Sequence, residues 1–139
     1  MEIADVKRKV VETIEGAKRR AAEHRTRADG ATKAYELFLD RTAVPMCRQI
    51  ANVLRAHGYA FTVFTPAGSV RLAPERSTDD YIELTLDTAA DTPMVVGHTR
   101  RSRGRRVLDR ERPMGDPATL KEEDVLAFLL EELEPFVDR

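Results

Sequence analysis

The sequence predicts an α+β domain in which two N-terminal helices precede an antiparallel β-meander of four or five strands, and a C-terminal helix packs on the sheet. Three observations carry this prediction. Apolar residues recur at a helical spacing before residue 58, alternate with polar residues over 59–111, and return to a helical spacing after 119. The chain of 139 residues has the length of one domain of ordinary size.

Residues 2–28 predict one long helix with a narrow apolar stripe, because they lack proline and their apolar side chains recur every three or four positions. Asp29 and Gly30 are expected to end it, since glycine readily adopts the left-handed conformation of a C-cap. Such a helix is about 40 Å long, more than a small domain covers. We therefore expect it to pair with another helix, which is either the next helix of the same chain or a copy from a second chain. Residues 1–30 are predicted to be a coiled-coil-like oligomerisation helix. The expected interface consists of Ile3, Val6, Val10, Ile14, Ala17 and Ala21.

Residues 31–139 are expected to form the single α+β domain, which begins with a helix over 31–57. Pro45 interrupts this helix, and two interpretations stay open. Either Thr42 caps a new helix with Pro45 in its first turn, or one helix is kinked at the proline. Gly58 is expected to end the helical stretch.

The meander is expected over residues 59–111, where the period of the apolar residues changes to two. Thr65–Gly68 is a turn signal between the first two strands. The clearest strand, 80–87, has one apolar and one polar face, which is typical of an antiparallel sheet with one solvated side. The predicted strands are 59–65, 69–73, 80–87, 94–101 and 105–111.

A linker over 113–118, marked by prolines and a glycine, is predicted to lead into a helix over 119–135. Thr119 and Glu122 have the spacing of a capping box, and Pro135 is expected to end the helix. Its apolar face is wide, so this helix should lie across the sheet.

Composition excludes several protein classes. Apolar residues make up 42% and charged residues 34% of the chain, which indicates a folded core. The single cysteine, Cys47, excludes a disulfide framework and a four-cysteine zinc site, and we expect it to be a buried core residue. The N-terminus lacks the apolar segment of a signal peptide, and the longest apolar run, Val125–Leu130, is too short for a membrane span. We therefore expect a cytoplasmic protein without membrane contact.

The sequence contains none of the common catalytic or phosphate-binding motifs. The three histidines are too scattered to predict a metal site, and no catalytic residue, metal or cofactor is predicted. The solvated sheet face is the expected place for a small ligand or a partner. His98 on this face is expected to contact Tyr81, Glu83 or Asp109. The predicted face residues are Tyr81, Glu83, His98 and Arg100.

Seven arginines give residues 100–112 a net charge of +5, within a chain of net charge −1. The favoured hypothesis is that this basic hairpin pairs with the acidic C-terminal helix, within or between subunits. The alternative is that it binds nucleic acid or another polyanion through phosphate contacts. No aromatic side chain lies between 100 and 112, which disfavours stacking on single strands. The arginines are Arg100, Arg101, Arg103, Arg105, Arg106, Arg110 and Arg112.

Three functions follow from these features. The leading hypothesis is a non-enzymatic interaction or regulatory module that forms a homo-oligomer, most simply a dimer, and can take a further protein partner. The second is nucleic-acid binding through the hairpin at 100–112. The third is an enzyme of unfamiliar type that uses the open sheet face, and it requires a concave pocket that gathers His98 with a carboxylate.

Overall fold

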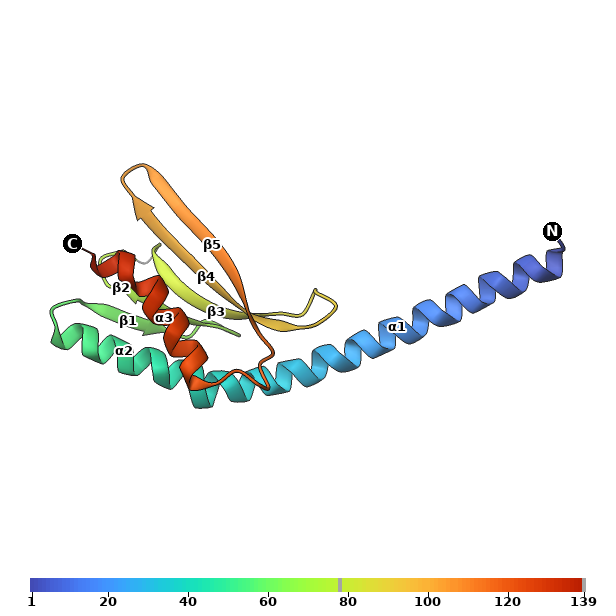
Figure 1. Cartoon of the computed structure of the whole chain (residues 1–139), viewed down its shortest axis with the longest axis horizontal. Coiled ribbons are helices and arrows are strands. Elements are labelled where there is room, and N and C mark those ends of the chain that lie inside the picture. Colours follow the sequence, from blue (N-terminus) through green and yellow to red (C-terminus); the bar gives the residue numbers. More distant parts are fainter. Residues whose placement is uncertain (78, 139) are drawn as a thin grey trace.

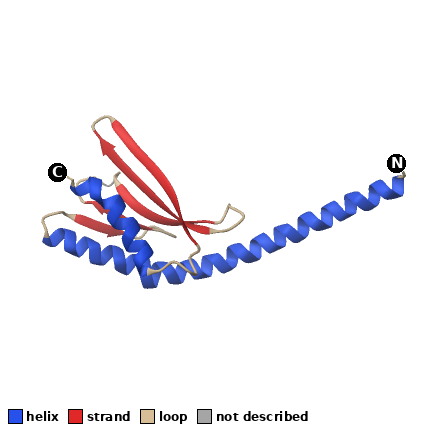
Figure 2. Ribbon diagram, in the orientation of Figure 1, coloured by secondary structure: helices blue, strands red, loops and turns tan. Residues whose placement is uncertain are grey.

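The computed structural model describes residues 1–77 and 79–138 and has the predicted α+β layout (Figures 1 and 2). A helical rod comes first, five strands follow, and one helix closes the chain. Within the described residues, no helix combines the length and apolar character that a bilayer crossing requires. The elements are α1 (Ile3–Phe38), the π-helical segment η1 (Leu39–Ala43), α2 (Val44–Ala56), β1 (Phe61–Phe64), β2 (Val70–Pro74), β3 (Tyr81–Asp87), β4 (Met94–Arg103), β5 (Arg106–Gly115) and α3 (Glu122–Val137).

The expected end of the first helix at Asp29 and Gly30 is wrong. α1 continues through Gly30 without a left-handed residue and ends only at Phe38. The reason is tertiary, because Tyr35 and Phe38 are almost fully buried against the domain. Their burial outweighs the cost of about 1 kcal/mol for a glycine inside a helix. The predicted boundary between segments 1–30 and 31–57 therefore falls inside one continuous helix.

The alternative left open at Pro45 is decided in favour of one interrupted rod. Pro45 lies in the first turn of α2, and η1 joins that turn directly to α1. A proline lacks the N–H for an i→i−4 bond and its ring crowds the carbonyl four residues earlier, so a wider π-helical turn accommodates it. The axis bends at this point (Figure 1). Gly58, with a φ of 89°, follows the end of α2 as expected.

The five strands form one antiparallel meander in the order β1-β2-β3-β4-β5. α2 contacts β1 and β2, while α3 contacts β3 and β4. The core side chains of the strands alternate along the sheet and meet those of the helices, so the helices cover one face. The other face is left without a helix. The largest fully buried strand side chains are Val70, Leu72, Ile82, Leu84 and Val95.

Gly97 allows α3 to approach the sheet closely. A Cβ atom built at this position would overlap the end of the Phe128 ring. Only hydrogen at this Cα allows the ring of Phe128, itself 3% exposed, to reach the backbone of β4. The pairing of Gly97 with Leu84 places this contact over the centre of the sheet.

The end of the chain departs from the predicted boundaries. β5 reaches Gly115, so Pro113 belongs to the strand rather than to a linker over 113–118. As an edge strand, β5 tolerates a proline that cannot donate a ladder hydrogen bond. The second hairpin turn lies at Gly104 and Arg105, and the meander ends later than 111.

α3 begins and ends later than the predicted 119–135. The carboxylate of Asp124 accepts a hydrogen bond from the backbone N–H of Lys121 at 2.9 Å, so the capping contact lies two residues beyond Thr119 and Glu122. Pro135 lies inside the last turn instead of ending the helix. Phe136 holds that turn through an edge-to-face contact with Phe61, with ring centroids 6.1 Å apart.

We expect Gly97→Ala to lower the free energy of unfolding by about 1–3 kcal/mol, because the added methyl group must displace Phe128. Urea denaturation monitored by circular dichroism measures the change. Gly30→Ala is the matched control, since nothing lies within 4 Å of its added Cβ. It should stabilise the helix by up to about 1 kcal/mol. An unchanged stability for Gly97→Ala would contradict the packing described here.

Candidate functional site

The four residues predicted for the open sheet face are neighbours on β3 and β4. Tyr81 pairs with Arg100, and Glu83 pairs with His98. All four therefore lie on the face opposite α3, as the alternation along each strand requires.

His98 makes two of the three contacts expected of it. Its Nε2 lies 2.5 Å from a carboxylate oxygen of Asp109, and its Nδ1 lies 3.5 Å from the Tyr81 hydroxyl. Asp109 thus orients the imidazole and leaves Nδ1 as the acceptor for the weak contact with Tyr81. The Tyr81 and His98 rings pack edge to face, with centroids 5.4 Å apart.

Arg71 completes this polar cluster and was not predicted from the sequence. Its guanidinium pairs with the carboxylate of Glu83, which is only 7% exposed, and lies 4.3 Å from the centroid of the Tyr81 ring. The hydroxyl of Ser69 also lies 3.4 Å from Glu83. The polarity of Arg71 alone marks it as a face residue, but only the register of β2 with β3 places it opposite Glu83.

Arg100 is the one member whose polar atoms are incompletely paired. Its buried Nε has no hydrogen-bond partner among the described residues. The directly opposite residue on β5 is Asp109, whose carboxylate instead contacts His98. By contrast, Arg71 and Glu83 form an ion pair with each other, so neither charge is free to bind a ligand.

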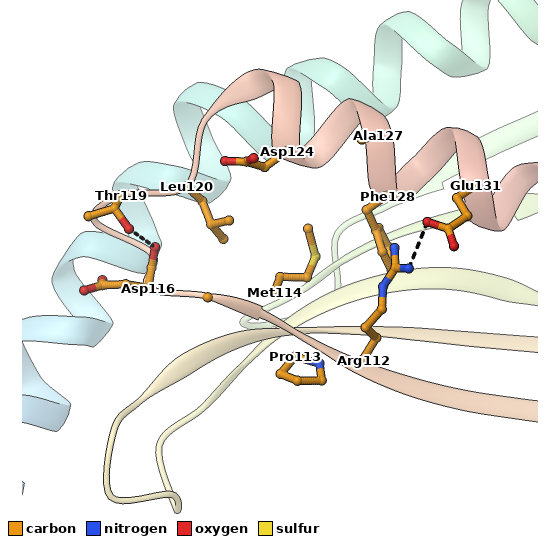
Figure 3. A pocket seen from close by; sticks show the side chains of 11 residues that line it. Arg112, Pro113, Met114, Asp116, Thr119, Leu120, Asp124, Ala127, Phe128 and Glu131 are labelled. Carbon is orange, nitrogen blue, oxygen red and sulfur yellow. Dashed lines mark hydrogen bonds and ion pairs between the residues drawn. The ribbon is translucent and has the colours of Figure 1, made fainter.

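Two hollows lie on the helix side of the sheet, and His98 lines neither. The first, of about 410 Å³, is bounded by the end of β5, the following loop and α3 (Figure 3). Met114, Leu120 and Phe128 contribute apolar walls to it, and an Arg112–Glu131 ion pair of 2.9 Å lies at its edge. The second, of about 330 Å³, lies between the β4–β5 hairpin and the end of α3. The pocket required for an enzyme on the open face is therefore not formed by these hollows.

Cys47 and the other two histidines lie apart from the polar cluster. Cys47 is buried in the core as expected, and burial raises the pKa of its thiol to about 12. His57 occupies the C-terminal end of α2, and His24 on α1 lies 3.3 Å from the carbonyl oxygen of Ala90. Among the described residues, no group of three or more His, Cys, Asp or Glu side chains could hold a metal ion.

Five of the seven arginines of the hairpin fall into two sets, one at its base and one at its tip. At its base, Arg110 pairs with Glu132 and Arg112 pairs with Glu131, both on α3. Glu132 is only 2% exposed and also accepts a hydrogen bond of 3.0 Å from the hydroxyl of Thr99. The charge and hydrogen bond of Glu132 raise the pKa of Arg110. Pairing with the acidic helix thus holds for these two arginines.

Arg103, Arg105 and Arg106 lie at the tip, which extends beyond α3 (Figure 1). Of the other two, Arg100 belongs to the polar cluster and Arg101 lines the second hollow. Arg103 pairs directly with Arg106 across the ladder, and Arg105 lies in the turn between them. All three are exposed, and no ion pair within the described residues includes them. Like charges directly opposite one another destabilise a strand pair. The tip is therefore a concentrated positive charge without a described counter-charge.

The apolar stripe of α1 is the largest exposed apolar feature on one element. α1 leaves the domain and projects well beyond it (Figure 1). Ile3 is 86%, Val10 51% and Ile14 47% exposed, and Val6 is comparable. Ala17 and Ala21 are exposed as well. The six residues predicted for the oligomer interface thus share one uncovered stripe in the single chain.

We expect Arg110→Ala to lower the free energy of unfolding by about 1–3 kcal/mol, because it leaves the buried carboxylate of Glu132 without its cation. Thermal and urea unfolding measure the loss. Arg103→Ala, which removes the same charge from the tip, should be neutral or slightly stabilising. Replacing Glu132 by glutamine in the Arg110→Ala protein should recover most of the loss. Equal effects of the two alanine variants would contradict the division of the arginines.

Three surfaces are therefore candidates for function: the polar cluster on the sheet, the cationic hairpin tip and the stripe of α1. The polar cluster pairs largely with itself, whereas the tip and the stripe expose charge and apolar area. Comparison of the chain with protein-family models, curated proteins and solved structures finds no match.

Proposed function

We propose that this protein is a non-enzymatic, cytoplasmic interaction module that forms a homodimer through residues 3–21 of α1. The observation that carries the proposal is the exposed stripe of Ile3, Val6, Val10 and Ile14 on a helix that projects from the domain. A free buried thiol at Cys47 is compatible with a reducing compartment.

The stripe continues the face by which α1 packs on its own domain. After Ala21, the three- and four-residue spacing is kept by His24, Ala28, Ala31, Tyr35 and Phe38, all of which are partly or fully buried. This line of side chains packs on the domain in the last third of α1. In the preceding part of the helix, the same line is uncovered. The uncovered part of the same line, from Ile3 to Ala21, is therefore available for a second helix.

An internal repeat extends the same regularity to the charges of α1. Residues 7–17 and 18–28 each begin with three basic residues, continue with two small apolar residues and a glutamate, and end in alanine. An eleven-residue period corresponds to about 3.67 residues per turn, so equivalent positions of the two repeats lie on the same side of a helix. This favours a helix selected for lateral pairing over a solvated extension.

We expect Val10→Asp to weaken dimerisation by about 100-fold, because the dimer would bury a carboxylate in an apolar seam. Sedimentation velocity and multi-angle light scattering over a concentration series measure the assembly. Val11→Asp is the matched control, since Val11 is similarly exposed at 42% but lies off the stripe, and it should leave the dimer intact. A wild-type chain that stays monomeric throughout the series would refute the proposal.

The hairpin tip supports a second function, the binding of duplex nucleic acid. The observation that favours it is the Arg103–Arg106 pairing, which brings like charges together and would be relieved by phosphates. A two-stranded β-ribbon fits the major groove, and arginine can contact phosphate with two hydrogen bonds. The absence of aromatic residues from 100–112 favours duplexes over stacked single strands.

We expect labelled duplex DNA to bind at low salt, and the triple variant R103A/R105A/R106A to bind at least about tenfold more weakly with a shallower salt dependence. Fluorescence anisotropy at several salt concentrations measures both quantities. The variant R25A/R27A/K33A removes the same charge from exposed positions of α1 outside the proposed dimer surface and should bind as the wild type does. Equal losses in the two variants, or no binding at low salt, would exclude the tip as the site.

A further inference from the structure

We propose that the two copies pair antiparallel, with Val10 of each copy at the two-fold axis and the two domains at opposite ends of a rod. This inference rests on the proposed dimer and specifies its partner surface as residues 3–17 of a second copy. Three features of the chain carry it: the position of the domain relative to the stripe, the blocks of charge along α1, and the spacing of the apolar residues.

The domain lies on the stripe side of α1. His24 contacts Ala90 in the β3–β4 loop, and the Tyr35 hydroxyl lies 2.7 Å from the carbonyl oxygen of Gly68 and 3.2 Å from that of Leu84, which share its one proton. A second helix packed in parallel along the stripe would therefore run into this domain after residue 21. Its own domain would occupy the same side at the same level. An antiparallel helix instead ends near residue 17 and carries its domain away from the first.

The charge blocks of α1 are unfavourable for a parallel pair in register. Lys7–Lys9 and Lys18–Arg20 are basic, while Glu12, Glu15 and Glu23 lie between and after them. In a parallel pair, each basic block lies beside the same block of the second copy, so basic residues are next to basic residues. Such like-charge pairs oppose association.

An antiparallel pair about Val10 separates the basic blocks of the two copies. Residue numbers at the same level along the rod then add up to about 20, so the block at 7–9 lies level with residues 11–13 of the partner subunit, which contain no basic residue. The block at 18–20 lies level with the first residues of the partner subunit, which include the partner's Glu2. The repulsion between like blocks in a parallel pair is thereby avoided.

The apolar positions match in the same register. Val10 faces its own copy, Val6 faces Ile14 of the partner subunit, and Ile3 faces Ala17 of the partner subunit. The large side chain at one end of the stripe is thus placed against the small one at the other end, which keeps the spacing between the helix axes even. The stripe side chains become smaller from Ile3 to Ala21 along one helix. In this pair, the larger side chains of one copy lie against the smaller ones of the other.

The arrangement determines the shape of the dimer. At 1.5 Å per residue, the two Tyr35 side chains that anchor α1 to each domain would lie about 75 Å apart. Each domain keeps its hairpin tip and open sheet face accessible. The dimer is therefore a spacer that presents two identical surfaces at a fixed separation.

Cysteine cross-linking with a short bismaleimide tests the arrangement. We expect Ile3→Cys alone not to link to itself, and a mixture of Ile3→Cys with Ala17→Cys to yield a covalent dimer. Val10→Cys should link to itself, and Val11→Cys, off the stripe, should link poorly. The native Cys47 is buried and does not interfere, which the wild-type chain controls for directly. Small-angle X-ray scattering of the wild-type dimer should show an elongated particle with two lobes.

The outcomes separate this inference from the proposed dimer. A dimeric mass together with self-linking of Ile3→Cys would overturn the antiparallel arrangement and leave the dimer standing. A dimeric mass without Ile3–Ala17 links would overturn the register. A monomeric mass for the wild type would remove both the dimer and the arrangement.

Discussion

One-sided burial of the sheet is the constraint on which the rest of the molecule depends. Every large apolar strand side chain of the core points toward α2 and α3, and Phe128 reaches β4 because Gly97 has no side chain. The opposite face must then satisfy its polar groups without a covering layer. It does so by pairing them laterally, as in the Arg71–Glu83 and His98–Asp109 contacts. Among the described residues of this face, the buried Nε of Arg100 is left without a partner, while the other charges are paired within the sheet.

α1 projects from the domain because only its last third packs on the rest of the chain. The helix is anchored by its last third, where the one hydroxyl proton of Tyr35 is shared between two backbone carbonyl oxygens and Phe38 enters the core. Burial raises the pKa of the Tyr35 hydroxyl, which remains a hydrogen-bond donor at any physiological pH. Because the helix is continuous through Gly30, its N-terminal half extends from this anchored segment. The uncovered stripe is thus carried by a continuous helix, which would lower the entropy lost in the proposed pairing.

α3 decides which hairpin charges are available. Its buried Glu132 and exposed Glu131 reach the base of the hairpin, where β5 runs beside the helix. Beyond that point the ribbon extends past the helix, and Arg103, Arg105 and Arg106 have no ion pair among the described residues. A near-neutral chain therefore carries a local positive tip, because charge neutralisation follows distance in space rather than the sum over the sequence.

The sequence by itself determined the element types, the meander, the stripe from Ile3 to Ala21 and the grouping of Tyr81, Glu83, His98 and Arg100 on one face. Each of these follows from a local period of two or of three to four residues. Only the tertiary structure decided that α1 continues past Gly30, that Pro135 stays helical, that Arg71 joins the polar cluster, and which arginines meet α3. Those outcomes depend on contacts between residues far apart in the chain, where burial and strand register override local preference.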